Sequence, residues 1–203
     1  MPAVTIKLSV RPSMDRLQQL LDKQEISDLL KRWCRAIDRL DLEAIRDVFH
    51  PDAVDDHGSY KGGIDGLVAW IRDRHRDIPF SMHAITNCLI DFLDDDRAVA
   101  ETYCIALQKY PNEARESLEK LVGKLDVEEG LPLDMTIACR YIDVVTRRQS
   151  EWKIERRTVV FDSVSVVPGV QIPDPSASGW ITGKRGGVGS ERDFLFSQLQ
   201  ETA

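Results

Sequence analysis

Apolar positions in the first third of the chain recur with a helical period. Between residues 15 and 39 they fall at steps of three and four, which places them on one face of a helix: Ile26, Leu29, Leu30, Trp33 and Ile37. Asp41 is a typical N-cap for a second helix, which Pro51 would end. The inward-facing positions of this second helix are Leu42, Ile45, Val48 and Phe49. A third helix is predicted over 63–77 by a stripe of Ile64, Leu67, Val68 and Ile71.

Strand patterns dominate from residue 83 onward. Segments 83–93 and 97–109 flank the acidic turn 94–96 and predict a hairpin. Segments 135–146 and 152–161 predict a second hairpin. The polar, helix-prone segment 111–131 between the hairpins indicates an excursion from the sheet. Helices followed by long antiparallel strands are typical of an α+β protein whose helices cover one face of the sheet.

The length of 203 residues suits a single domain with extensions. We expect an N-terminal arm over 1–14, an α+β domain over 15–162 and a C-terminal extension over 163–203, which is rich in Gly, Pro and Ser at its start. The extension is expected to form a lid or contacts between subunits.

The composition limits the classes of partner that the protein can bind. A formal net charge of −7 and a pI of about 5.2 provide no positive field for nucleic acid, and no apolar run is long enough to span a membrane. The first residues lack the features of a secretory signal. The four cysteines are far apart, show no CxxC spacing and lie in mostly apolar runs, which predicts buried reduced thiols and a cytoplasmic location.

Asp38 and His83 are the first candidates for chemistry. Asp38 lies at the edge of the apolar stripe of the first helix, so its carboxylate could face a partly dry space. The alternative is a solvated aspartate at a helix end. His83 opens a strand on the face of Ile85, Asn87 and Leu89, where it could act as a general base or be a hydrogen-bonded structural residue. A carboxylate bound to one ring nitrogen would leave the other free to take a proton.

Two further residues could stabilise developing charge. Arg157 would bind an oxyanion or leaving group if it faced a pocket, although an arginine in a mixed strand is usually exposed. The phenol of Tyr103 could donate to substrate or simply pack in the core. His50, His57 and His75 form no HxH, HxxxH or HExxH pair, so we expect no metal. GxSxG, GxGxxG and GxxxxGK[ST] motifs are absent, and we expect no cofactor.

The succession DLLKRWCRAIDRLDLEAIRDVFHPDAV, GSYKG, HAITN and WKIERR over residues 15–162 resembles the SnoaL-like branch of the nuclear transport factor 2 superfamily. Its spacing is similar to that of hexachlorocyclohexane dehydrochlorinases, bile acid 7α-dehydratases and scytalone dehydratases. The resemblance implies a cone-shaped α+β barrel with a curved, mostly antiparallel sheet, an assembly that is often trimeric, and cofactor-free eliminations or related reactions.

The resemblance also implies roles for individual residues. Asp38 and His83 match the family's catalytic pair, and Arg157 matches its pocket arginine. Trp33 stands where relatives carry Lys or Tyr, which speaks against a halide or hydroxyl leaving group held there and implies a larger aromatic pocket. The substrate-binding candidates are Trp33, Tyr60, Lys61, Asn87 and Tyr141.

Together these features predict a cofactor-independent lyase with an apolar pocket for a small hydroxylated aromatic or alicyclic compound. His83, oriented by Asp38, would remove a proton, and Arg157 and Tyr103 would stabilise charge during loss of water or retro-aldol cleavage. Such chemistry is typical of dehydratases and of lyases that deformylate lignin-derived diarylpropanes. The alternatives are a non-catalytic binding or assembly module and a small subunit of a ring-hydroxylating dioxygenase. We expect a homo-oligomer, with a trimer favoured.

Overall fold

The computed structural model describes residues 15–170 and residue 185. Within them the chain runs through helices and strands in this order: α1 (Arg16–Arg39), α2 (Leu42–Asp47), β1 (Phe49–Asp56), β2 (Lys61–Gly63), α3 (Ile64–His75), β3 (Phe80–Asp94), β4 (Arg97–Tyr110), the 3-10 turn η1 (Asn112–Ala114), α4 (Arg115–Val122), β5 (Leu133–Arg148) and β6 (Glu151–Pro168). None of the helices in this part of the chain is long and apolar enough to cross a membrane.

The three predicted N-terminal helices are all present. The apolar stripe of α1 is buried against the sheet, and Asp15 caps the helix by accepting a hydrogen bond from the backbone N–H of Leu17. Asp41 caps α2 as predicted, with a 3.0 Å bond from the N–H of Ala44. Phe49 was expected to be an inward position of this helix but instead begins β1, and the helix ends at Asp47 rather than at Pro51.

Six strands form one sheet in the order β2-β1-β6-β5-β4-β3. Both predicted hairpins are confirmed, as β3–β4 and β5–β6, and the pairing of β1 with β6 is parallel. The sequence did not reveal β1, because Pro51 lacks the N–H that a regular ladder needs. Pro51 lies where the β1–β6 register shifts, between Phe49 and Val54, and is tolerated there.

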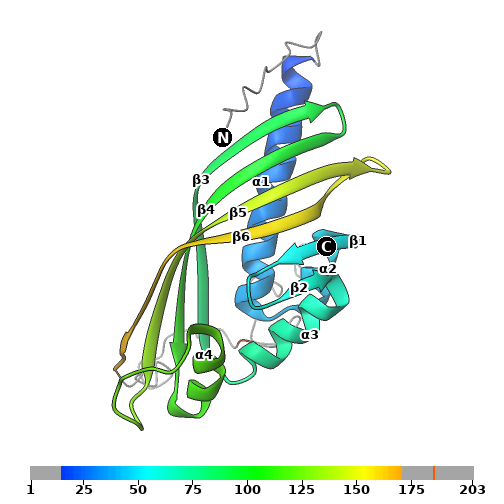
Figure 1. Ribbon diagram of the computed structural model, residues 1–203. Helices are drawn as coiled ribbons and strands as arrows, with labels where there is room; N and C mark the ends of the chain where they lie inside the picture. The colour runs from blue at the N-terminus through cyan, green and yellow to red at the C-terminus, as the bar shows by residue number, and fades with distance from the viewer. Residues whose placement is uncertain (1–14, 171–184, 186–203) are drawn as a thin grey trace, which may run out of the picture.

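The predicted α+β fold is confirmed, and the sheet is curved but open. Its edges are β2 and β3, so the expected barrel is a cone-like half-shell. Figure 1 shows the four long strands β3–β6 bending at mid-length, with one half of the sheet beside α1 and the other half extending toward α4. The helices α1 and α3 therefore stand on the concave side.

A bulge in β3 changes which side chains face inward. The pairing with β4 shifts register between Ile85 and Cys88, which inserts an extra residue into β3. Before the bulge, odd-numbered residues face the interior, and after it Ile90 is 5% exposed while Leu89 is 59% exposed. The simple alternation expected for residues 83–93 is therefore wrong beyond Ile85.

The expected excursion over 111–131 contains η1 and α4. The predicted arm over 1–14 lies outside the described residues, as does most of the predicted extension over 163–203. Of that extension, β6 continues to Pro168 in pairing with β5, and Arg185 contacts the ends of two helices.

Candidate active site

Asp38 and His83 meet, although 45 positions separate them in the chain. Asp38 lies in the last turn of α1 and His83 near the start of β3. The Oδ1 atom of Asp38 lies 2.6 Å from Nδ1 of His83, and its Oδ2 accepts a 2.9 Å bond from the His83 backbone N–H. Both carboxylate oxygens of Asp38 thus hold His83. This sets the orientation of the imidazole ring and leaves its Nε2 as the nitrogen available to a ligand.

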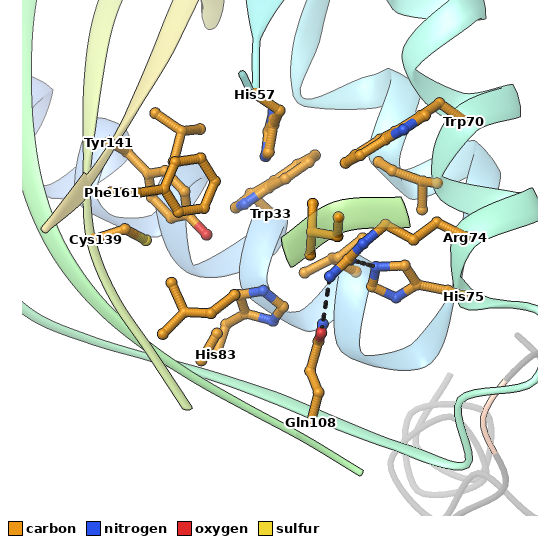
Figure 2. Close-up of a pocket in the computed structure, with 16 residues that line it drawn as sticks. Trp33, His57, Trp70, Arg74, His75, His83, Gln108, Cys139, Tyr141 and Phe161 are labelled. Carbon is orange, nitrogen blue, oxygen red and sulfur yellow. Dashed lines mark hydrogen bonds between the residues drawn. The ribbon is translucent and has the colours of Figure 1, made fainter. Parts of the chain in front are cut away.

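The histidine ring borders a cavity between the helices and the concave face of the sheet. Side chains from α1, α3, α4 and the strands β3–β6 line it, and Figure 2 shows them converging. The cavity volume is about 50 Å³, enough for a few water molecules. An apolar cavity that binds benzene is about 150 Å³, so a ring-sized ligand requires side chains to move outward.

A second histidine–carboxylate pair faces the same cavity. His57 follows β1, and its Nδ1 is hydrogen-bonded to Oδ1 of Asp55, which is fully buried. Figure 2 shows His57 and His83 pointing into the cavity from opposite sides. The sequence analysis considered His57 only as a metal ligand. The DxH spacing was the missed signal, since residues two apart on an extended strand share a face.

Aromatic side chains form much of the wall. Trp33 makes edge contacts with Phe49 at 5.5 Å and Tyr141 at 6.5 Å between ring centroids. Trp70 of α3 stacks on Tyr60 at 6.0 Å. The Nε1 atom of Trp33 is buried, and none of the described residues forms a hydrogen bond with it. Trp33 and Tyr141 both line the cavity, as expected of substrate-binding residues. Burial raises the pKa of the Tyr141 phenol well above its usual value.

A polar cluster lies at another part of the wall. Arg74 of α3 donates from Nη2 to Oε1 of Gln108 and to the hydroxyl of Tyr110, each at 3.0 Å, and its Nη1 contacts His75. Burial lowers the pKa of His75 well below 6.5, and the adjacent arginines lower it further. His75 is thus neutral near physiological pH. The sequence analysis missed both Arg74 and Gln108, which lie in charged or strand segments without a motif.

Comparison with known proteins places the chain in a family. Residues 18–158 match the model of the SnoaL-like domain. The chain belongs to the SnoaL-like family. This family lies within the nuclear transport factor 2 superfamily. A search of curated protein sequences found no match.

Solved structures with the SnoaL-like fold include three from Novosphingobium. The dehydrochlorinase LinA-type3 of Novosphingobium barchaimii has a TM-score of 0.62 at 16% identity, covering 79% of this chain and all (100%) of the other. A scytalone dehydratase-like protein of Novosphingobium aromaticivorans has a TM-score of 0.59 at 16% identity, covering 74% and 91%. An aromatic ring hydroxylase-like protein of that organism has a TM-score of 0.58 at 23% identity, covering 73% and 94%.

Arg157 of this SnoaL-like domain does not face the cavity, contrary to prediction. It is completely buried, and its Nε and Nη2 each bond an oxygen of Asp143 at 2.7 Å. The β5–β6 register places these two residues directly opposite each other. Burial alone would lower the pKa of Arg157, but Asp143 outweighs burial and raises it. The guanidinium stacks 4.6 Å from the Trp33 ring and 4.3 Å from the Tyr141 ring, so it supports the aromatic wall from behind.

Four other candidates also lie away from the cavity. Tyr103 is 44% exposed on the outer face, because Thr102 and Cys104 take the inward positions of β4. Asn87 is exposed at the β3 bulge, which interrupts the expected face. Lys61 is exposed and pairs with Asp56. Tyr60 does not line the cavity but supports Trp70, and its hydroxyl donates to the Gly63 carbonyl.

Three of the four cysteines are buried and free, as expected, but Cys88 is exposed beside the β3 bulge. Burial raises the pKa of Cys34 to about 12, which makes it a poor nucleophile. Cys139 lines the cavity and lies opposite Cys104 in the β4–β5 ladder. In the described part of the chain, no group of three or more His, Cys, Asp or Glu side chains is arranged to hold a metal ion.

Proposed function

We propose that this SnoaL-like protein is a cofactor-independent lyase that acts on a small hydroxylated aromatic or alicyclic compound. The observation that carries the proposal is the Asp38–His83 pair at the border of the cavity. The dehydrochlorinase and the scytalone dehydratase-like protein that share the fold are named for eliminations, which supports a lyase type of reaction.

In the proposed reaction Nε2 of His83 takes a proton from the substrate. For a dehydration the proton comes from carbon, its electron pair forms the C=C bond, and the adjacent C–O bond breaks. His57 on the opposite side then supplies a proton to the departing hydroxide, which leaves as water. For a retro-aldol cleavage the proton comes from a hydroxyl, the C–C bond breaks, and a small aldehyde leaves while the carbanion takes the proton from His57.

The proposed mechanism needs more than a base. General-base assistance typically contributes about 10²–10⁴-fold. The remaining acceleration would come from orientation by the aromatic wall and from exclusion of water. Asp38 would stabilise the imidazolium that forms when His83 accepts the proton.

The first test replaces the base. We expect His83→Ala to lower kcat by at least about 10²-fold and Asp38→Asn to lower it by a similar factor, because the asparagine cannot stabilise the imidazolium. The assay screens metal-stripped protein against hydroxylated aromatic and alicyclic compounds, following new conjugated C=C absorbance and released formaldehyde. The matched control is Thr86→Val, an exposed β3 residue.

Unchanged turnover in His83→Ala, with the fold verified by circular dichroism, would remove His83 from the mechanism. Compounds that bind to the wild type without turning over would favour the non-catalytic binding module. Copurification with an iron-bearing chain would favour the dioxygenase small subunit, the class suggested by the aromatic ring hydroxylase-like protein of similar fold.

A further inference from the structure

Arg74 has a polar environment that the proposed acid–base chemistry does not use. Its side chain extends from α3 into the wall of the cavity beside Trp70, 5.6 Å from the centre of that ring (Figure 2). Nη2 is engaged by Gln108 and Tyr110, both buried. The Nε–H is buried and has no acceptor among the described residues. One donor of this guanidinium is therefore left for a ligand.

The charge of Arg74 is also uncompensated. No carboxylate among the described residues forms an ion pair with it, and the nearby phenols of Tyr110 and Tyr141, whose pKa burial raises, carry no charge at neutral pH. Arg157 by contrast lies against Asp143, and Asp38 and Asp55, which lie behind the two cavity histidines, are each engaged by one of these histidines. Arg74 is half-buried, and even partial burial of a cation is costly unless it is paired. Burial accordingly lowers the pKa of Arg74, but an arginine stays charged at neutral pH.

Gln108 and Tyr110 also fix the position of this charge. The Tyr110 hydroxyl donates to Gln108 Oε1 at 2.7 Å, and the Gln108 amide donates to Ser81 at 3.3 Å. The guanidinium is thus held by a buried network before a ligand arrives, which reduces the ordering cost of binding. Of the other lining residues, His75 contacts Nη1 of Arg74, whereas Ile71 and Leu121 are apolar.

We propose that Arg74, held by Gln108 and Tyr110, is a subsite for a carboxylate carried by the ligand of this cavity. A carboxylate oxygen would accept the free Nε–H and supply the missing negative charge, while the ring of the same ligand would lie among Trp33, Trp70 and Tyr141. The anion subsite itself is independent of the reaction. Its extension, that the substrate is a hydroxylated aromatic acid, rests on the proposed lyase function.

The test compares two ligands of similar shape that differ in charge. We expect benzoate to bind the wild-type protein at least tenfold more tightly than benzyl alcohol, measured by isothermal titration calorimetry in low-chloride buffer at about pH 8, where unperturbed histidines are neutral. Arg74→Met should lose this preference while its affinity for benzyl alcohol is unchanged. Arg72→Met, an exposed arginine of the same helix, is the matched control and should behave as wild type.

Equal affinity for the two ligands, absence of benzoate binding, or an undiminished preference in Arg74→Met would overturn the subsite. If Arg74→Met does not fold, chloride titration of the wild type decides instead: chloride must weaken benzoate binding and leave benzyl alcohol binding unchanged. His83→Gln separates this proposal from the lyase function, because it should retain the preference for benzoate whether or not it abolishes turnover.

Discussion

His57 and His83 each have a carboxylate behind the ring and the same cavity in front of it. Two such pairs on opposite sides suit a reaction in which one histidine takes a proton and the other gives one. Their protonation states must differ during turnover, so the rate should depend on pH with two limbs.

Replacing His57 by Gln tests the second role. We expect kcat to fall about 10²-fold and the limb of the pH–rate profile that reports the acid to flatten, because glutamine cannot transfer a proton. The measurement is kcat/KM against pH for wild type and variant, with Ser59→Ala, in the adjacent turn, as control. An unchanged two-limbed profile in His57→Gln would contradict an acid role for this residue.

At this scale the sequence predicted only some of the site. Asp38 and His83 could be found because a helical period and a strand start each fixed one of them, and the family resemblance paired them. Arg157 and Tyr103 could not be placed correctly, because the sheet face on which each side chain lies depends on the pairing register of β4, β5 and β6. The charge imbalance at Arg74 depends on which carboxylates lie near it in space, which no local pattern records.

Among the elements, the C-terminal ends of α1 and α3 meet at one arginine. Arg185 donates to the carbonyls of Ile37 and Asp38 at the end of α1, and to those of His75 and Ile78 at the end of α3. A cation suits these positions because helix C-termini carry unsatisfied carbonyls and partial negative charge. Burial lowers the pKa of Arg185 to about 10. The buried ring of His75 lies between this arginine and Arg74.

This junction predicts a loss of stability in acid. The pKa of His75 is lower in the folded state than its unfolded value of about 6.5, so below that pH the unfolded state binds a proton that the folded state does not. The free energy of unfolding should therefore decrease as the pH is lowered, by up to about 1.4 kcal/mol per pH unit from this group. Urea denaturation between about pH 7 and pH 5 measures it. His75→Asn should show a shallower dependence, and an identical slope would contradict a neutral buried His75.

The elements themselves were largely predictable, whereas their irregularities were not. Long runs of periodic apolar residues specified α1, α3 and the two hairpins. The strand β1 contains Pro51 and several acidic residues, and its pairing with β6 on one side and β2 on the other holds it extended. The β3 bulge has no local signal in Ile85–Cys88, because it depends on the partner strand.

On the scale of the whole molecule, the outer face of the open sheet carries exposed apolar side chains beside the ion pairs of Arg140 with Glu101 and Asp162. Leu89, Tyr103 and Ile105 are all more than 40% exposed there, and exposed apolar patches often mark subunit contacts. We propose that this face forms the interface of the homotrimer expected from the family resemblance.

The oligomer prediction is tested by sedimentation. We expect the wild type to sediment at three times its chain mass of 23.0 kDa. Ile105→Lys should shift it toward the monomer, because a charge placed in an apolar interface lacks a partner. Lys109→Ala, a substitution of a charged residue on the same strand, serves as control and should remain a trimer. A wild type that sediments at the mass of one chain would contradict the interface.

The extra residue in β3 gives the two halves of one strand different evolutionary freedom. His83, before the bulge, lines the cavity, whereas beyond it Ile90 is buried and Phe92 packs against Trp152. Substitutions in the first half can alter which compounds are accepted while leaving the second half to maintain the framework. Changes in specificity among relatives should therefore accumulate on one side of the bulge and conservative replacements on the other.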